Sequence, residues 1–183
     1  MKKVYVILSR TGTIPSRIIG LVTGSQFTHA SLALFPCRHK LYSFARRKMR
    51  NFLVAGFIHE DIDSFVFAKH PNSSCNVYEI TVSDMAYQKM SDKIASFEQK
   101  YLKHKYNFVG AITSQFGIKR TLKYRYTCSQ FVSTVLASSG EIELPKHPSL
   151  MKPMDLTKIP GAKLIYSGII KNISFNSKKQ IHT

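Results

Sequence analysis

The sequence predicts an α+β fold in which an antiparallel sheet packs against helices. A β-branched and aromatic run at residues 4–8 is typical of a buried strand. The alternation at residues 76–82 indicates another strand, and the segment after Ser83 spaces its apolar residues along one helix face. With 183 residues, 44% of them hydrophobic, the chain can bury the core of one globular domain.

The strands are predicted from β-branched and aromatic runs that are bounded by turn residues. They cover residues 4–8, 27–35, 41–44, 53–58, 64–68, 76–82 and 162–170. The second and third of these strands form a hairpin, because Pro36 opens a polar turn between them. His29 lies near the start of the hairpin, beside small residues that leave room for its ring.

Helices are predicted where apolar residues recur every three or four positions. They cover residues 16–22, 84–105, 107–116 and 128–139. Ser83 is a good cap for the second of these helices, and Gly140 ends the last. A proline-rich, extended segment follows, and the chain ends in a polar, basic stretch. We therefore expect a single domain at residues 1–170 and a flexible tail at residues 171–183.

The net charge of +17 is the strongest bulk property of the chain. It favours anionic partners such as nucleic acid, lipid headgroups or acidic wall polymers. No nucleic-acid-binding motif supports specific nucleic-acid recognition. No signal peptide or membrane-spanning run is evident, so a cytoplasmic location is expected, while peripheral membrane contact and the oligomeric state stay open.

The cysteine pattern argues against structural cross-links. Cys37, Cys75 and Cys128 are odd in number and lack C-x-x-C spacing, so neither a disulfide framework nor a zinc site is indicated. Free thiols of this kind suit a reducing compartment. The sequence predicts no metal and no cofactor.

Cys128 stands at the start of a stretch with helical spacing, residues 126–136. Thr127 and Ser129 are short polar residues of the kind that cap helices. A thiol in this position ionises readily, because free backbone N–H groups and the positive end of the helix stabilise a thiolate. The alternative is a small buried side chain in an ordinary core helix.

His29 is the best candidate partner for Cys128 among the seven histidines. The others lie in turns, in the tail, beside an acidic pair or at a helix end. A cysteine hydrolase needs an imidazole that pairs with the thiolate and donates a proton. The alternative for His29 is a structural, hydrogen-bonded histidine.

These motifs resemble a known family. His29 at the head of a small-apolar strand, the return strand of residues 41–46 and the later motif of residues 126–132 are similar to the circularly permuted NlpC/P60 group of papain-like enzymes. That group includes the YiiX- and YaeF-like proteins and, more distantly, the lecithin:retinol acyltransferase family. Its His strand precedes its Cys helix, the reverse of the ordinary papain-like order. The resemblance spans most of the chain but rests on two short motifs.

The resemblance implies a papain-like fold with the nucleophile, Cys128, at a helix N-terminus and His29 as the general base. The third member of the site departs from the family pattern, since Ser43 is the only compact polar residue on the strand after His29. A serine can orient an imidazole but supplies no charge. A carboxylate from Glu60 or Glu79 is the alternative, as is a site that has become a binding pocket.

Tyr126 and Ser129 flank the nucleophile and are the candidate substrate-binding residues. Tyr126 would offer its hydroxyl at the cleft, or else pack as an aromatic side chain in the core. The backbone N–H of Cys128 would contribute to an oxyanion hole.

The resemblance implies a thiol hydrolase, an amidase or peptidase that cuts an amide or isopeptide bond, of cell-wall peptide type, through an acyl-enzyme. Its substrate would be a peptide- or acyl-containing, anionic molecule. Two alternatives remain. One is a lipid acyltransferase or phospholipase that uses the same thiol. The other is a non-catalytic basic module that binds anions or nucleic acid, in which Cys128 only packs the core.

Overall fold

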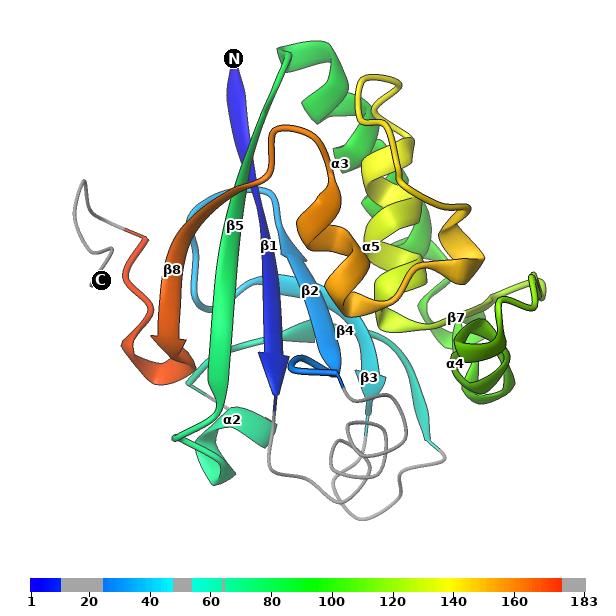
Figure 1. Cartoon of the computed structure of the whole chain (residues 1–183), viewed down its shortest axis with the longest axis horizontal. Helices are drawn as coiled ribbons and strands as arrows, with labels where there is room; N and C mark the ends of the chain where they lie inside the picture. The colour runs from blue at the N-terminus through cyan, green and yellow to red at the C-terminus, as the bar shows by residue number, and fades with distance from the viewer. Residues whose placement is uncertain (11–24, 48–53, 64, 176–183) are drawn as a thin grey trace.

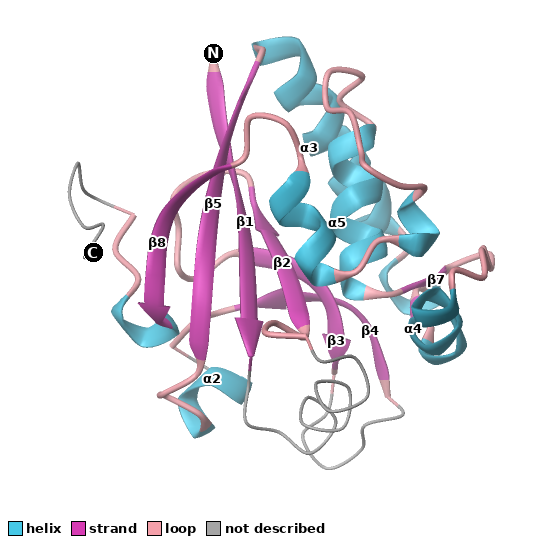
Figure 2. Ribbon diagram, viewed as in Figure 1, coloured by secondary structure: helices cyan, strands magenta, loops and turns pink. Residues whose placement is uncertain are grey.

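The computed structural model describes residues 1–10, 25–47, 54–63 and 65–175. In this part of the chain an antiparallel six-stranded sheet packs against helices, which confirms the predicted α+β arrangement (Figures 1 and 2). The strand order across the sheet is β4-β3-β2-β1-β5-β8. The bounds are β1 Lys2–Arg10, β2 His29–Ala33, β3 Leu41–Arg46, β4 Ala55–Glu60, β5 Ser74–Val82 and β8 Lys163–Ile169.

The helices include two long ones, α3 and α5, which pack together on one side of the sheet (Figure 1). The α-helices are α2 Phe65–Lys69, α3 Asp84–Gln99, α4 Phe108–Thr113 and α5 Cys128–Ala137. Short 3-10 helices are η1 Tyr101–Lys103, η2 Ser114–Phe116, η3 Pro148–Leu150, η4 Pro153–Lys158 and η5 Ile170–Asn172. A separate parallel pair joins β6 Lys105–Tyr106 to β7 Arg125–Tyr126.

Alternate side chains of β1 contribute to a hydrophobic core on each face of the sheet. Val4, Val6 and Leu8 belong to a large cluster that includes buried side chains of α3 and α5. Tyr5 and Ile7 belong to a smaller cluster on the opposite face. Successive residues of a strand point to opposite faces, so one apolar strand supplies both layers. A strand covered on both faces reads as a continuous apolar run, as this one does.

Side-chain caps explain where the two long helices begin. The backbone N–H of Ala86 donates to Ser83 Oγ at 3.1 Å, and that of Gln130 donates to Thr127 Oγ1 at 3.1 Å. Each cap satisfies a backbone donor that has no partner inside the helix. Thr127 therefore sets the first residue of α5.

One predicted strand is wrong. The sequence predicts an extended segment at residues 64–68, of which residue 64 lies outside the described residues. From Phe65 the chain forms α2 instead, and Phe67 packs into the smaller core cluster. An apolar run of this length fits a strand or a helical turn equally well, and packing decides between them.

Other predictions meet the structure in part. The helix predicted at residues 16–22 lies outside the described residues. The helix predicted at residues 107–116 forms as α4 followed by η2. Within the segment predicted to be a tail, Ile173 is buried against the smaller core cluster. In the described part of the chain, no helix combines the length and the apolar character that crossing a bilayer requires.

Candidate active site

Three elements contribute one side chain each to a buried polar cluster. His29 begins β2, Glu60 ends β4 and Cys128 begins α5. These residues are far apart in the sequence, and the fold brings them together.

Glu60 holds the His29 imidazole. The His29 Nε2 atom lies 2.8 Å from Glu60 Oε1, and the two side chains are 16% and 10% exposed. The hydroxyl of Ser31 donates to the second oxygen of Glu60 and lies 3.3 Å from His29 Nε2. His29 and Ser31 share a strand face because they are two residues apart. The carboxylate therefore has a partner at each oxygen.

The charges of His29 and Glu60 stabilise one another. Burial alone lowers the pKa of His29, but the Glu60 carboxylate and the hydrogen bond with Cys128 raise it well above its ordinary value. Burial alone raises the pKa of Glu60, but the charge and hydrogen bond of His29, followed by Ser31, lower it. A buried acid and base in contact favour the ion pair.

The Cys128 thiol is only 4% exposed, yet its surroundings favour the thiolate. Burial raises its pKa, but the hydrogen bond and charge of His29 and the backbone N–H groups of Ala30 and Ser129 lower it below the ordinary value. Cys75 provides the contrast within the chain, because burial without such partners raises the pKa of its thiol to about 12. The two buried thiols are thus chemically different.

Tyr106, at the end of β6, is a site residue that the sequence reasoning missed. Burial raises its pKa well above the ordinary value, and the charge and hydrogen bond of the Cys128 thiol raise it further, while the Cys128 backbone N–H opposes them. The Tyr106 hydroxyl thus lies against both the thiol and the backbone N–H of Cys128. Tyr106 is brought close to Cys128 by the parallel pairing of β6 with β7, each of which has only two residues. No sequence pattern reveals a pairing this short.

Glu60, rather than Ser43, stands against His29. Ser43 is fully buried, and its Oγ forms no hydrogen bond of ordinary geometry within the described residues, although it contributes to the lowered pKa of Glu60. A hydroxyl on β3 faces the carboxylate and not the imidazole. Glu79, the other alternative, pairs instead with Lys3 at 2.9 Å.

Tyr126 and Ser129 contact other side chains and backbone atoms of the fold. The ring of Tyr126 packs against Phe44 and Phe97, with centroids 5.3 Å and 5.1 Å away. The Ser129 hydroxyl donates to the carbonyl oxygen of Met151 at 2.5 Å. The Ser129 hydroxyl is thus engaged in the core, whereas its backbone N–H supports the thiolate. Tyr126 packs through its ring and is half-buried, so its role at the site stays a prediction.

A cavity of about 610 Å³ runs along the outer strands of the sheet. Its walls come from β3, β4, α2, α3 and η1, and they include Glu60, Arg46 and Arg47 but neither Cys128 nor His29. The cavity therefore reaches the carboxylate side of the cluster, while the thiol remains covered.

Comparison with known proteins places the fold. No protein-family model and no curated protein matches the chain. Among solved structures, YiiX from Escherichia coli O157:H7 aligns over 92% of this chain and 98% of its own, with a TM-score of 0.57. The fold is similar to that of YiiX. At 15% identity the likeness concerns the fold alone, so the chemistry depends on the residues described above.

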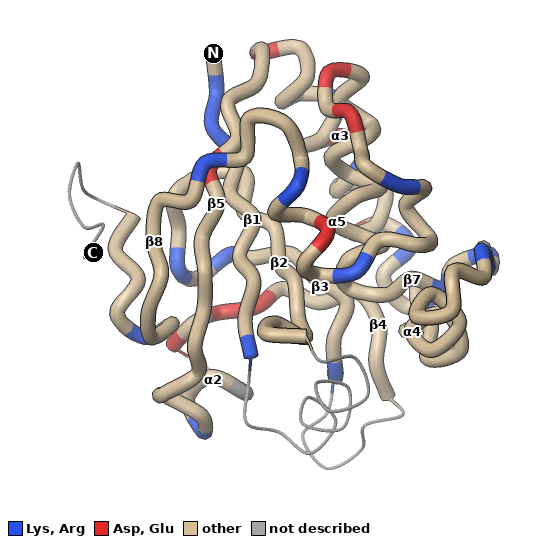
Figure 3. The backbone as a smooth tube through the Cα atoms, viewed as in Figure 1, with Lys and Arg blue, Asp and Glu red and all other residues tan. Residues whose placement is uncertain are grey.

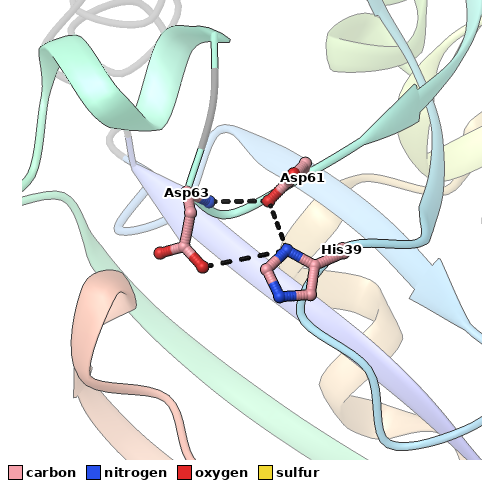
Figure 4. A group of neighbouring side chains, drawn as sticks. All are labelled: His39, Asp61 and Asp63. Atoms are coloured by element: carbon pink, nitrogen blue, oxygen red, sulfur yellow. Dashed lines mark hydrogen bonds and ion pairs between the residues drawn. The ribbon is translucent and has the colours of Figure 1, made fainter.

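YiiX is described as a metalloprotein, so the fit of a metal to this chain matters. Among the described residues, one group brings three candidate ligand atoms within 4.8 Å of one another: His39, Asp61 and Asp63 (Figure 4). His39 Nδ1 lies 3.0 Å from Asp61 Oδ1, and the Arg38 guanidinium lies 2.7 Å from Asp63 Oδ1. These side chains are already paired with one another or with Arg38, and the Arg38 cation lies beside a carboxylate that would have to hold the metal. The group therefore does not fit a resident metal.

Proposed function

We propose that this protein is a thiol hydrolase that cleaves an amide or isopeptide bond through an acyl-enzyme on Cys128. The observation that carries the proposal is the imidazole of His29, held by Glu60 on one side and in contact with the thiol on the other. A nucleophile, a base and a group that orients the base form the minimal set for this chemistry.

The steps follow from the charges of the site. The Cys128 thiolate attacks the substrate carbonyl carbon, and a C–S bond forms as the carbonyl oxygen takes the negative charge. The His29 imidazolium then gives its proton to the leaving nitrogen as the C–N bond breaks. Water attacks the thioester while His29 accepts a proton, and the thiolate leaves. Glu60 keeps the imidazole oriented and stabilises its cationic form throughout.

Two donors are available for the oxyanion. The backbone N–H of Cys128 lies at the start of α5, where it has no partner inside the helix. The Tyr106 hydroxyl lies beside it. Donors arranged in advance around the developing oxyanion are among the largest contributions to acyl-transfer catalysis.

We further propose that the protein belongs to the circularly permuted, papain-like NlpC/P60 group. The order of the His29 strand and the Cys128 helix in the sequence supports this proposal, as does the similarity of the fold to YiiX. The substrate would then be an anionic peptide of the cell-wall type, which the net charge of +17 favours.

The test is product formation from defined substrates. Purified protein would be incubated with cell-wall peptides and, separately, with mixed phospholipids, and the released amines and lysolipids would be measured. We expect new amines with the wild type and with Cys37→Ser, and none with Cys128→Ser. Lysolipid without amine would instead support the phospholipase alternative. Equal activity of wild type and Cys128→Ser would refute the thiol mechanism.

A further inference from the structure

The helix α4 exposes large apolar side chains and buries small residues, the reverse of an ordinary surface helix. Its buried positions carry Gly110 and, in η2, Ser114. Large apolar side chains point outward, with Ile112 64% exposed and Phe116 76% exposed. A helix that packs on a protein core normally shows the reverse pattern. The apolar side therefore lacks a partner within the described part of this chain.

The exposed apolar residues of this segment follow one another closely along the chain. They are Phe108, Val109, Ile112, Phe116 and Ile118. Most are spaced by three or four residues and so lie along one side of α4 and η2. We call this set the α4 surface. More than half of the exposed large apolar side chains of the described residues lie between Tyr101 and Ile118, so the feature is local.

Basic residues precede and follow the α4 surface along the chain. The exposed ones are Lys103, Lys105, Lys119, Arg120, Lys123 and Arg125. No Asp or Glu occurs between Glu98 and Glu141. The loop beyond α4 is marked by basic residues at its tip (Figure 3). Exposed apolar residues flanked by basic residues alone, which we call the rim, are typical of a segment that lies in the interface of an anionic membrane.

We propose that the α4 surface docks this protein on the surface of an anionic lipid bilayer. The apolar side chains would enter the boundary between headgroups and acyl chains, and the rim would contact lipid phosphates. A second copy of the chain is a poor occupant, because two such surfaces would bring like charges together. A nucleic acid would satisfy the rim but would leave the aliphatic side chains of Val109, Ile112 and Ile118 without an apolar environment.

The α4 surface lies next to the candidate active site. Phe108 contacts Tyr106, with ring centroids 4.9 Å apart, and the Tyr106 hydroxyl contacts Cys128. Docking would thus hold the covered thiol close to the membrane plane. The binding proposal does not depend on the proposed function, although this position would favour a substrate located at the membrane.

The test is binding of the full-length chain to vesicles, measured by co-sedimentation. We expect binding to phosphatidylcholine mixed with phosphatidylglycerol, and much weaker binding to phosphatidylcholine alone. Replacing Ile112 and Phe116 by Ser should lower the partition coefficient about tenfold. Each of Lys119→Ser and Lys123→Ser should lower it about fivefold, and added salt should weaken it further.

The matched controls lie elsewhere on the surface. Met85→Ser with Leu164→Ser removes exposed apolar side chains from α3 and β8, and Lys158→Ser with Lys163→Ser removes exposed charges. Both controls should bind as the wild type does. Absence of vesicle binding would overturn the proposal. It would also be overturned if the control variants lost as much vesicle binding as the variants of the α4 surface. Binding to single-stranded RNA alone, or self-association that the Ile112 and Phe116 changes abolish without any vesicle binding, would overturn it too.

Discussion

Single residues decide whether the buried cluster is a working site, and Glu60 is the most informative of them. Its carboxylate keeps the His29 imidazole charged and oriented. We expect Glu60→Gln to lower kcat/KM by about 10- to 100-fold, because the amide cannot stabilise the imidazolium by charge. The pH range over which kcat/KM stays high should also narrow in this variant, because His29 would lose its proton at a lower pH and Cys128 would ionise at a higher one.

Ser43→Ala is the matched control for this change. Ser43 faces Glu60 rather than His29, so its loss should alter kcat/KM by no more than a few fold. If the two variants lose activity equally, the assignment of Glu60 as the partner of the imidazole fails.

Tyr106 makes a second prediction at this scale. Tyr106→Phe removes the hydroxyl that lies against the Cys128 thiol and backbone N–H but keeps the ring that contacts Phe108. We expect kcat to fall about a hundredfold with little change in KM, as for loss of one oxyanion donor. Tyr124→Phe alters a neighbouring phenol and should leave kcat unchanged. An unchanged kcat in Tyr106→Phe would limit Tyr106 to a packing role.

Cys128 and His29 carry local signals in the sequence that make them candidates, whereas Glu60 and Tyr106 carry none. Cys128 follows a capping threonine, and His29 stands at a strand end, so each carries a local signal. Glu60 was only one of two acidic alternatives, because its contact with His29 crosses the sheet between strands that are not neighbours. Such contacts depend on packing and leave no periodic trace in the sequence.

Among the helices and strands, α5 depends on its N-terminal cap to place Cys128 in the first turn. The Thr127 hydroxyl accepts the N–H of Gln130 and thereby fixes the first turn. We expect Thr127→Ala to lower the free energy of unfolding by about 1 kcal/mol. Urea titration would measure this loss.

An exposed threonine provides the comparison. Thr121→Ala, in the loop before β7, should change the free energy of unfolding by less than about 0.5 kcal/mol. Equal losses in the two variants would show that the cap contributes nothing specific to α5.

Elements with strong local signals were predictable, and those shaped by packing were not. The predicted helix after Ser83 begins where α3 begins, because cap and apolar periodicity agree there, but α3 ends at Gln99, before the predicted end at residue 105. The short run predicted as a strand at residues 64–68 had no such agreement, and its described part, from Phe65, is a helix. For α4 the periodicity predicted the helix but not its orientation, because Phe108 and Ile112 face outward while Gly110 is buried.

At the scale of the whole molecule, the sequence predicted the class of fold but not its order. Apolar alternation is enough to predict a sheet packed against helices. It cannot predict that β1 lies between β2 and β5, since this order arises from long-range pairing. The fold is similar to that of YiiX at only 15% sequence identity, and different residues can meet the same packing requirements.

The whole fold also explains how a buried thiol stays ionisable. The sheet provides His29 and Glu60, α5 provides Cys128 with the N–H groups of its first turn, and the β6–β7 pair provides Tyr106. Each contribution comes from a different part of the chain. The reactivity of Cys128 therefore reports directly on whether these parts meet as described.

The rate at which iodoacetamide alkylates each cysteine, followed against pH by peptide mass spectrometry, measures whether His29 and Glu60 favour the thiolate of Cys128. The thiolate is the reactive form, and its pKa at Cys128 is lowered by His29. Cys128 should thus reach its half-maximal rate at a pH below the ordinary thiol value of about 8.5. In Glu60→Gln this midpoint should rise, while buried Cys75 stays unreactive. A Cys128 midpoint at or above the ordinary value, unchanged in Glu60→Gln, would contradict the account.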